Sequence, residues 1–196
     1  RERLEQIRRE ALLSNPLLVF DKVLVVKRRS SSHEASGAEL GLPSNAQCNA
    51  SLPREGYDNE IAVLSSLRSD AKWTTVYRPA NGGYVGEIAL HWDADRLLFS
   101  QSDAINWKLL EIHVDGTGLH QVSRMPDDVD SLDACYLPDG RIVFGSTASY
   151  QAVPCGDGRN RVSNLYVMDA DGCDVRQLCF DQDHNLHPCV LANGQV

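Results

Sequence analysis

Short turn motifs recur along the chain at fixed spacing, and this repetition constrains the possible folds more than any other feature. Residues 95–99 (DRLLF) match residues 140–144 (GRIVF), and residues 137–141 (LPDGR) match residues 191–195 (LANGQ), at offsets of 45 and 54. A second motif, residues 114–122 (VDGTGLHQV), returns at residues 170–178 (ADGCDVRQL) at an offset of 56. Asp-Gly turns between β-branched and aromatic runs indicate β-hairpins. The chain therefore contains a repeated unit with two kinds of hairpin.

A unit with both hairpins has four strands, here called a, b, c and d in chain order. Self-similar four-stranded units of roughly 40 to 55 residues are typical of β-propeller blades. We predict blades at about 16–78, 85–124 and 132–180, with strand a of a fourth beginning near His187. A β-sandwich also has regular short strands, but it does not usually repeat both turns in register. The predicted fold is therefore all-β, a β-propeller with about three and a half blades present.

The N-terminal stretch has helical rather than strand-like spacing. Residues 1–14 are predicted to form a short helix and linker, because Leu4, Ile7 and Ala11 fall on one face and Pro16 follows. The chain starts at Arg1 rather than at a Met and stops just after the turn at 192–194. A closed propeller ring needs at least four blades. We therefore expect residues 15–196 to be a partial propeller from a longer protein.

Composition and motif content exclude several classes of protein. The chain has 27 acidic and 19 basic residues, a net charge of −8, so it would repel phosphate backbones and we expect no nucleic-acid partner. Its apolar runs are far shorter than the ~18 to 20 residues of a membrane-spanning helix, so we expect no membrane span. No Gly-rich phosphate loop, G-x-S-x-G or H-E-x-x-H motif occurs, which leaves nucleotide-binding, serine-hydrolase and zincin classes without support.

Six cysteines stand at positions 48, 135, 155, 173, 179 and 189, and no two have the C-x-x-C spacing. Zinc ribbons, thioredoxin-type motifs and haem-attachment motifs are therefore excluded within this segment. The residues fit small buried thiols of a cytosolic chain, and they also permit disulfides in an oxidising compartment.

The hairpins resemble those of known propeller repeats. Residues 137–144 (LPDGRIVF) resemble the a–b hairpin of TolB-type repeats, and residues 164–178 (NLYVMDADGCDVRQL) resemble their c–d hairpin. Three longer strings, 15–28 (NPLLVFDKVLVVKR), 51–65 (SLPREGYDNEIAVLS) and 133–147 (DACYLPDGRIVFGST), resemble proteins similar to the hydrazine synthase alpha subunit. This second resemblance covers most of residues 15–196.

The resemblance implies a propeller domain within a larger exported bacterial protein, and hence a periplasmic location. In hydrazine synthase itself, c-type haem domains follow the propeller, so haem c is expected only if such domains follow here. Any activity inherited from the family would be that of an oxidoreductase of the hydrazine synthase type. Its catalytic groups would lie outside this segment.

Propeller topology assigns each connection to a face. The b–c and d–a connections emerge on one face, and the a–b and c–d turns emerge on the other. The offset grows from 45 to 56 within the third blade, which places an eleven-residue insertion in its b–c loop, residues 145–163. The b–c loop of the first blade, about 27–58, is longer still. Long loops in compact domains are commonly functional, so we expect binding on this loop-rich face.

Candidate metal ligands lie on or beside the same connections. Asp133 and His187 occupy equivalent positions in successive units, His184 precedes His187, and Cys155 lies in the long loop of the third blade. This set would suit a borderline-soft divalent ion such as zinc. The alternative is that these side chains are hydrogen-bonded to backbone at blade junctions, as most buried polar groups are.

Other residues near these connections are candidates for contact with a ligand or partner. They are Arg54, Tyr57, Asp58, Asp130, Cys135 and Asp183. The leading hypothesis is a binding or scaffolding propeller that docks against other domains or subunits of one complex, or takes a small molecule. The alternatives are a metal-dependent enzyme with its site on this face, and a TolB-like module that binds a protein or peptide.

Overall fold

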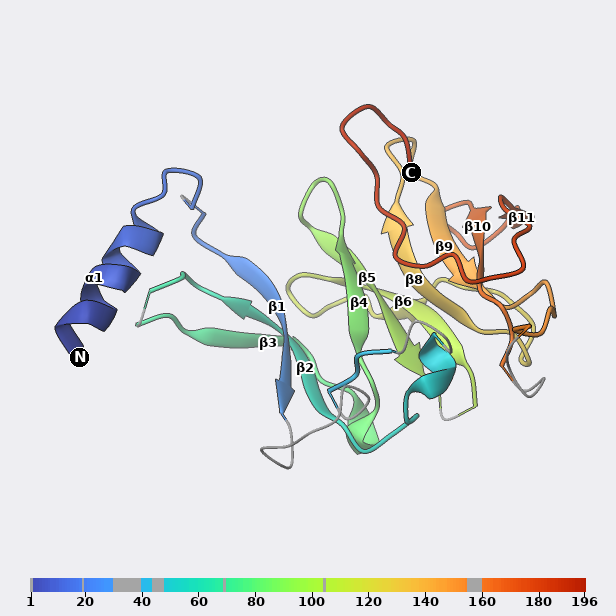
Figure 1. The fold of residues 1–196 in the computed structure, drawn as a ribbon, viewed down its shortest axis with the longest axis horizontal. Coiled ribbons are helices and arrows are strands. Elements are labelled where there is room, and N and C mark those ends of the chain that lie inside the picture. The colour runs from blue at the N-terminus through green and yellow to red at the C-terminus, as the bar shows by residue number, and fades with distance from the viewer. Residues whose placement is uncertain are drawn as a thin grey trace.

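The structure is a computed structural model that describes residues 2–18, 20–29, 40–43, 48–68, 70–103, 105–154 and 160–196. It is mostly β, with three antiparallel sheets side by side and one short α-helix, α1 (Glu2–Leu13), at the N-terminal end (Figure 1). Two one-turn 3₁₀ helices span Asn49–Ser51 and Ala80–Gly82. The predicted all-β class and N-terminal helix are therefore confirmed.

Each sheet is a meander in which every strand pairs with its neighbour in the sequence. The first sheet contains β1 (Val23–Arg29), β2 (Asp58–Leu64) and β3 (Trp73–Tyr77). The second contains β4 (Gly86–Leu90), β5 (Arg96–Ser102), β6 (Trp107–His113) and β7 (His120–Gln121). The third contains β8 (Ser131–Tyr136), β9 (Ile142–Ser146), β10 (Asn164–Met168) and β11 (Arg176–Gln177). The described sheets do not close into a ring, so the number of blades in a complete ring stays a prediction.

The two c–d turns have the same backbone hydrogen bonds. Gly116 donates to the His113 carbonyl at 2.9 Å, and Gly172 donates to the Asp169 carbonyl at 2.9 Å. Both glycines have positive φ, +87° and +81°, and each lies against the backbone at the end of the preceding sheet. A Cβ at Gly116 would lie 2.9 Å from the Val76 carbonyl oxygen. These turns therefore need glycine both for backbone conformation and for the close packing of neighbouring sheets.

The first sheet has three strands among the described residues rather than the expected four. The strand expected just after Pro16 is replaced by a turn, in which Asn15 accepts hydrogen bonds from Leu17 and Leu18. Backbone groups used in this turn are not free to extend the ladder, and Leu17 stays exposed. The equivalent of strand a in this sheet is therefore missing from the part of the chain described.

The segment after His187 also lacks the expected strand. Its turn forms all the same: Leu191 donates to the Gln195 carbonyl at 2.8 Å, just as Leu137 donates to the Arg141 carbonyl at 2.7 Å. In the second and third sheets strand a pairs with the strand b that follows it. No described residue supplies such a partner here, so the segment is irregular.

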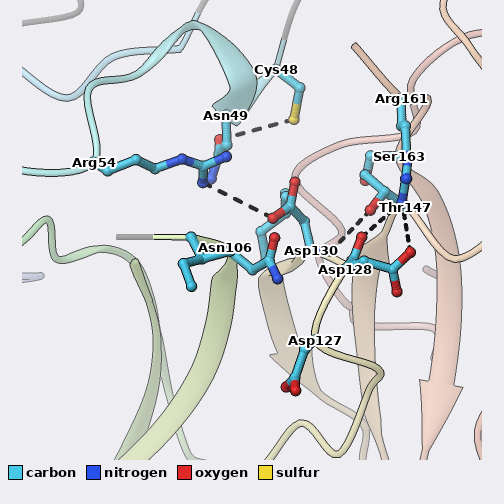
Figure 2. A pocket seen from close by; sticks show the side chains of 12 residues that line it. Cys48, Asn49, Arg54, Asn106, Asp127, Asp128, Asp130, Thr147, Arg161 and Ser163 are labelled. Atoms are coloured by element: carbon cyan, nitrogen blue, oxygen red, sulfur yellow. Dashed lines mark hydrogen bonds and ion pairs between the residues drawn. The ribbon is translucent and has the colours of Figure 1, made fainter. Parts of the chain in front are cut away.

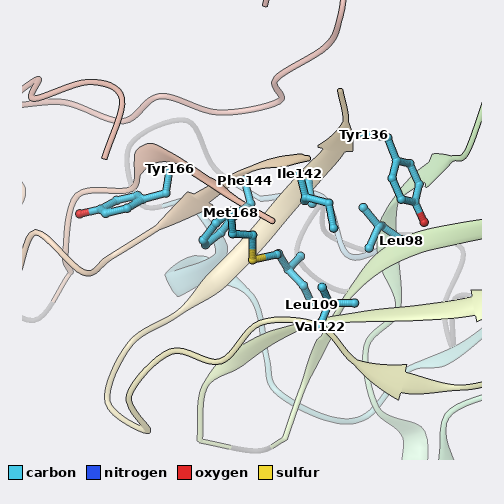
Figure 3. Packing of buried hydrophobic residues seen from close by; sticks show 9 residues of the cluster. Leu98, Leu109, Val122, Tyr136, Ile142, Phe144, Tyr166 and Met168 are labelled. Carbon is cyan, nitrogen blue, oxygen red and sulfur yellow. The ribbon is translucent and has the colours of Figure 1, made fainter. Parts of the chain in front are cut away.

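The apolar cores lie between adjacent sheets. Between the second and third sheets, Leu98 and Leu109 pack with Phe144 and Met168 (Figure 3). A separate cluster joins the first and second sheets and includes Ile61, Val85, Leu97, Phe99 and Ile112. Helix α1 buries no residue, so sheet-on-sheet packing holds the fold together. In the part of the chain described, no helix has both the length and the apolar character needed to cross a bilayer.

Candidate functional site

A cavity of about 370 Å³ lies at one end of the sheets, where connections from all three sheets meet (Figure 2). We call it the loop-face cavity. It is lined by Cys48, Asn49 and Arg54 from the β1–β2 connection, Ile105 and Asn106 from β5–β6, Asp127, Asp128 and Asp130 from β7–β8, Leu132 on β8, and Thr147, Arg161 and Ser163 from β9–β10. These are b–c connections and one d–a connection. The cavity therefore lies on the face that the repeat analysis assigned to binding.

An aromatic cluster holds the long β1–β2 connection in place beneath the cavity. Tyr57, near the end of that connection, contacts Tyr84 edge to face with ring centroids 5.4 Å apart, and Tyr84 contacts Trp107 at 4.8 Å. Cys48 and Leu52 are buried in the same cluster. Burial raises the pKa of the Cys48 thiol to about 12, so it stays protonated. The connection is therefore anchored by packing on both sides of Arg54.

Arg54 forms one wall of the cavity. Its guanidinium stacks over the Trp107 ring at 4.9 Å from the ring centroid. Its Nη1 atom lies 4.0 Å from Asp130 Oδ1, which is too long for a hydrogen bond. This buried Nη1 has no hydrogen-bond partner among the described protein groups. Arg54 is thus fixed in position with an unused donor.

Asp130 forms the facing wall and is held rigidly. Its Oδ1 accepts the Trp107 backbone N–H at 2.9 Å, and its own N–H donates to Thr147 Oγ1 at 2.9 Å. Its carbonyl accepts hydrogen bonds from Thr147 N–H and from the Ser146 hydroxyl. Burial raises the pKa of Asp130, while the Trp107 N–H and the Arg54 guanidinium oppose that rise. The carboxylate keeps spare acceptor positions, because the only hydrogen bond described to its oxygens is that of Trp107.

Arg161 and Asp128 form the third charged wall, and they are hydrogen-bonded within that wall. Arg161 donates to the Asp128 carbonyl at 2.7 Å and stacks on the Tyr150 ring at 4.6 Å. The Tyr150 hydroxyl donates to Asp128 Oδ1 at 3.1 Å. Ser163, buried at the back of the cavity, has a hydroxyl oxygen with no hydrogen-bond partner among the described groups. Its backbone N–H donates to Nδ1 of His184 at 3.1 Å.

A second cavity, of about 360 Å³, lies along the innermost strands of the second and third sheets, and we call it the inner-strand groove. Glu87, Asp133 and His187 occupy equivalent positions there, and all three have positive φ, between +54° and +57°. The Asp133 N–H donates to Glu87 Oε2 at 3.1 Å, and the His187 N–H donates to Asp133 Oδ2. Each carboxylate therefore accepts a backbone hydrogen bond from the next repeat.

The carboxyl groups of this groove have shifted protonation equilibria. Burial raises the pKa of Glu87, and the nearby charge of Asp133 raises it further. Burial also raises the pKa of Asp133, and the contacts from His187 oppose that rise. His187 Nδ1 lies 3.0 Å from Asp133 Oδ2, so the structure brings this pair of predicted ligands together.

Three of the four predicted zinc ligands are described, and Asp133 and His187 are the two of them that lie together. His184 faces Ser163, and with Asp133 and His187 it does not form a group of three ligand atoms within 4.8 Å. Cys155 lies outside the described residues. Over the described ranges, the one group with that spacing is His91, Asp93 and Asp95 in the β4–β5 turn, where Arg96 Nη2 lies 2.7 Å from His91 Nε2. Because Cys155 is not described, the zinc site stays a prediction.

Most of the remaining predicted contact residues lie away from the loop-face cavity. Tyr57 is buried in the aromatic cluster, and Asp58 begins β2 in ion pairs with Arg29 and Arg78. Cys135 lines the inner-strand groove, where burial raises the pKa of its thiol to about 11. Asp183 is exposed and accepts the His184 N–H at 2.8 Å. Only Arg54 and Asp130 from that predicted set line the loop-face cavity.

Sequence reasoning missed Arg161, Ser163 and Glu87. Glu87 carried a usable signal, because it stands 46 positions before Asp133 and extends the repeat into strand a. Arg161 and Ser163 lie within the inserted loop 145–163 that the offsets located, but nothing in the repeat distinguished them from the rest of that loop, because the second sheet has no counterpart of similar length.

Comparison with known proteins supports the fold. No protein-family model matches the sequence, and no curated protein matches it. The solved structure of Kuenenia stuttgartiensis hydrazine synthase superposes with a TM-score of 0.62 and 13% identity, covering 89% of this chain. TolB from Acinetobacter baumannii superposes with a TM-score of 0.48 and 19% identity over 69% of this chain and 33% of that chain. The chain spans 27% of the hydrazine synthase chain, and a likeness at this identity shows a propeller-like fold alone.

Proposed function

We propose that this segment is the binding propeller of a larger exported protein like the hydrazine synthase alpha subunit, and that its loop-face cavity holds a polar ligand. The ligand is a small molecule or a polar group of a neighbouring domain or subunit. Catalytic groups, including any haem, would be supplied by segments other than this one. The periplasmic location is part of the same proposal and rests on the sequence resemblance.

The observation that carries the proposal is the buried Nη1 donor of Arg54, which has no hydrogen-bond partner among the described groups and stands opposite the Asp130 carboxylate in the cavity. Arg54 and Asp130 are each fixed by Trp107, yet they stay 4.0 Å apart. Buried polar groups in proteins are normally hydrogen-bonded, and leaving them unpartnered costs free energy. Such an arrangement is expected where a ligand completes the hydrogen bonds. A volume of about 370 Å³ also falls in the range of ligand pockets.

Binding fits the described residues better than catalysis does. A nucleophilic hydroxyl needs a base within hydrogen-bond reach. Ser163 Oγ has no such partner among the described groups, and Nδ1 of the neighbouring His184 already accepts the Ser163 backbone N–H. The described lining of the cavity thus offers hydrogen-bonding groups without an activated nucleophile.

A thermal-unfolding screen with small polar compounds tests the proposal on three proteins. These are the wild type, Arg54→Met, and the matched control Arg141→Met at the opposite end of the sheets, where Arg141 pairs with Asp139 in an exposed turn. A ligand at 100 times its Kd should stabilise the wild type and the control by about 2.7 kcal/mol. Arg54→Met should lose that stabilisation. Equal stabilisation of all three proteins, or no stabilising compound, would contradict the proposal.

A further inference from the structure

The 4.0 Å spacing between the unpartnered Arg54 donor and the Asp130 carboxylate narrows the chemistry of the ligand, and this inference rests on the proposed function. We propose that the loop-face cavity recognises an uncharged primary carboxamide or urea-type group, held between the Arg54 guanidinium and the Asp130 carboxylate. Such a group presents a hydrogen-bond acceptor and a donor side by side. Arg54 supplies the complementary donor, and Asp130 supplies the complementary acceptor.

The protein does not close this gap by itself. A direct N–H···O hydrogen bond needs a separation of about 2.7–3.2 Å, whereas Arg54 Nη1 and Asp130 Oδ1 are 4.0 Å apart. Stacking on the Trp107 ring holds the guanidinium, and hydrogen bonds from Trp107 N–H and to Thr147 hold the aspartate. Donor and acceptor therefore stand as two fixed points 4.0 Å apart, and the dashed line that joins them in Figure 2 marks an ion pair rather than a hydrogen bond.

A carboxamide matches these two points. Its oxygen and nitrogen lie about 2.3 Å apart, as follows from amide bond lengths. Two hydrogen bonds of about 2.9 Å can then run almost parallel, from Arg54 to the amide oxygen and from the amide nitrogen to Asp130. A main-chain peptide group cannot do this, because its C=O and N–H point to opposite sides in the trans form.

Charged groups of the same shape match less well. A carboxylate would accept from Arg54 but would place a negative charge against Asp130. An amidinium would donate to Asp130 but would place a positive charge against Arg54. Like charges at such distances are unfavourable in a partly buried site. The pair therefore selects for a neutral group with one donor edge and one acceptor edge.

The rest of the cavity fits a small body attached to that group. Leu132 and Ile105 supply apolar surface, and the buried Ser163 hydroxyl supplies one more hydrogen-bonding position. Arg161 and Asp128 are already paired with each other, so they add no unmatched charge. The volume of about 370 Å³ suits a compact amide of one ring or a short chain.

Three probes of equal shape test the inference: benzamide, benzoate and benzamidinium. Their affinities are measured by titration calorimetry for wild type, Arg54→Met, Asp130→Asn and the control Arg141→Met. Wild type and control should bind benzamide about tenfold more tightly than either charged probe, the effect of one mismatched hydrogen bond. Arg54→Met should shift the preference to benzamidinium, since Asp130 is then unopposed. Asp130→Asn should shift it to benzoate.

The outcomes separate this inference from the proposed function. If wild type binds benzoate or benzamidinium as tightly as benzamide, the carboxamide inference is wrong and the binding propeller stands. If no probe binds at millimolar concentration while other compounds stabilise the wild type in the screen, the result is the same. If nothing binds in either experiment, both proposals fail. Circular dichroism and unfolding midpoints of each variant show whether a lost preference comes from a lost fold.

Discussion

The two ends of the sheets are built on different principles. At the turn end, the turns repeat the same geometry. In the two c–d turns, the Thr117 backbone N–H donates to Asp115 Oδ1 at 2.9 Å, and the Cys173 backbone N–H donates to Asp171 Oδ1 at 2.9 Å. At the loop end, the b–c connections differ in length between sheets, running from Arg29 to Asp58, from Ser102 to Trp107, and from Ser146 to Asn164. The turns at one end thus share the same hydrogen bonds, whereas the connections at the other end differ in length.

This difference separates the residues that make the fold from those that make the site. Turn-end Asp side chains accept hydrogen bonds from backbone N–H groups of their own turns, and the glycines of the c–d turns lie against the preceding sheet. At the loop end, Arg54 and Ser163 keep polar atoms without partners among the described groups, around a cavity that connections from all three sheets line. Substitutions at the turn end should therefore change stability, and substitutions at the loop end should change binding.

The largest effect is expected at the turn end, for Gly172→Ala. Gly172 has φ +81°, and a Cβ there would overlap the Val122 carbonyl oxygen. The left-handed conformation and the overlap together should lower the free energy of unfolding by about 3 kcal/mol. Gly140→Ala is the matched control, because Gly140 has φ +89° and nothing within 4 Å of its Cβ position. It should lose only about 1–2 kcal/mol. Equal losses in urea denaturation would refute the packing role.

A smaller loss is expected where the strands begin, for Asp133→Ala. This change removes the acceptor of the His187 N–H, and a hydrogen bond to a charged group contributes about 1.5–3 kcal/mol. We expect a loss of about 2 kcal/mol in urea denaturation. Asp133→Asn should keep most of the stability, because its amide oxygen still accepts and Asn tolerates the positive φ. Both variants remove the repulsion with Glu87, so identical losses would show that the hydrogen bond contributes nothing.

The buried carboxyl of Glu87 should give the protein a measurable pH dependence. Its pKa is raised in the folded state above its ordinary value of 4.5, so the folded state holds the proton more tightly than the unfolded state. This contribution is complete below pH 4.5 and is lost as pH rises through the raised pKa. A one-unit rise in pKa corresponds to about 1.4 kcal/mol. Glu87→Gln should therefore be more stable than wild type at pH 8 and equal to it at pH 4. Parallel stability–pH curves for the two proteins would contradict this.

The smallest effect is expected at Ala94, in the β4–β5 turn. Ala94 donates to the His91 carbonyl, as Gly140 donates to the Leu137 carbonyl, but it has φ +54° without being glycine. Ala94→Gly should raise the free energy of unfolding by about 0.5–1 kcal/mol, because relief of the left-handed conformation exceeds the added chain entropy. A lower melting temperature for this variant would show that the turn is not strained at this residue.

The turn end was predictable from the sequence because its geometry depends on local chemistry. Glycine at positive φ, and an Asp that accepts a hydrogen bond from the backbone N–H two residues later, leave a recognisable pattern. The hairpins around Gly116, Gly140 and Gly172 were therefore located correctly. The missing strand near Leu17 was not foreseen, because the sequence there is as apolar as a strand. A local turn at Asn15 decides the outcome.

At the loop end, the sequence predicted on which face the residues lie but not which side chains line the cavity. Topology placed Arg54 and Asp130 on the correct face, but the direction of each side chain depends on contacts between distant loops. Tyr57 illustrates this, since packing against Tyr84 turns it into the core rather than toward a ligand. The repeat offsets revealed the insertion that holds Arg161 and Ser163, but no counterpart in another repeat showed which of its residues reach the cavity.

The most direct test of the account is an amide chemical-shift titration of isotope-labelled wild-type protein with benzamide. Binding in the loop-face cavity should shift the Trp107 backbone N–H most strongly, because it shares Asp130 Oδ1 with the bound group. The turn-end amides of Gly116 and Gly172 should not move. Saturable shifts at Trp107 and Ser163 alone would support the account, whereas shifts centred on the turn end, or none that saturate, would contradict it.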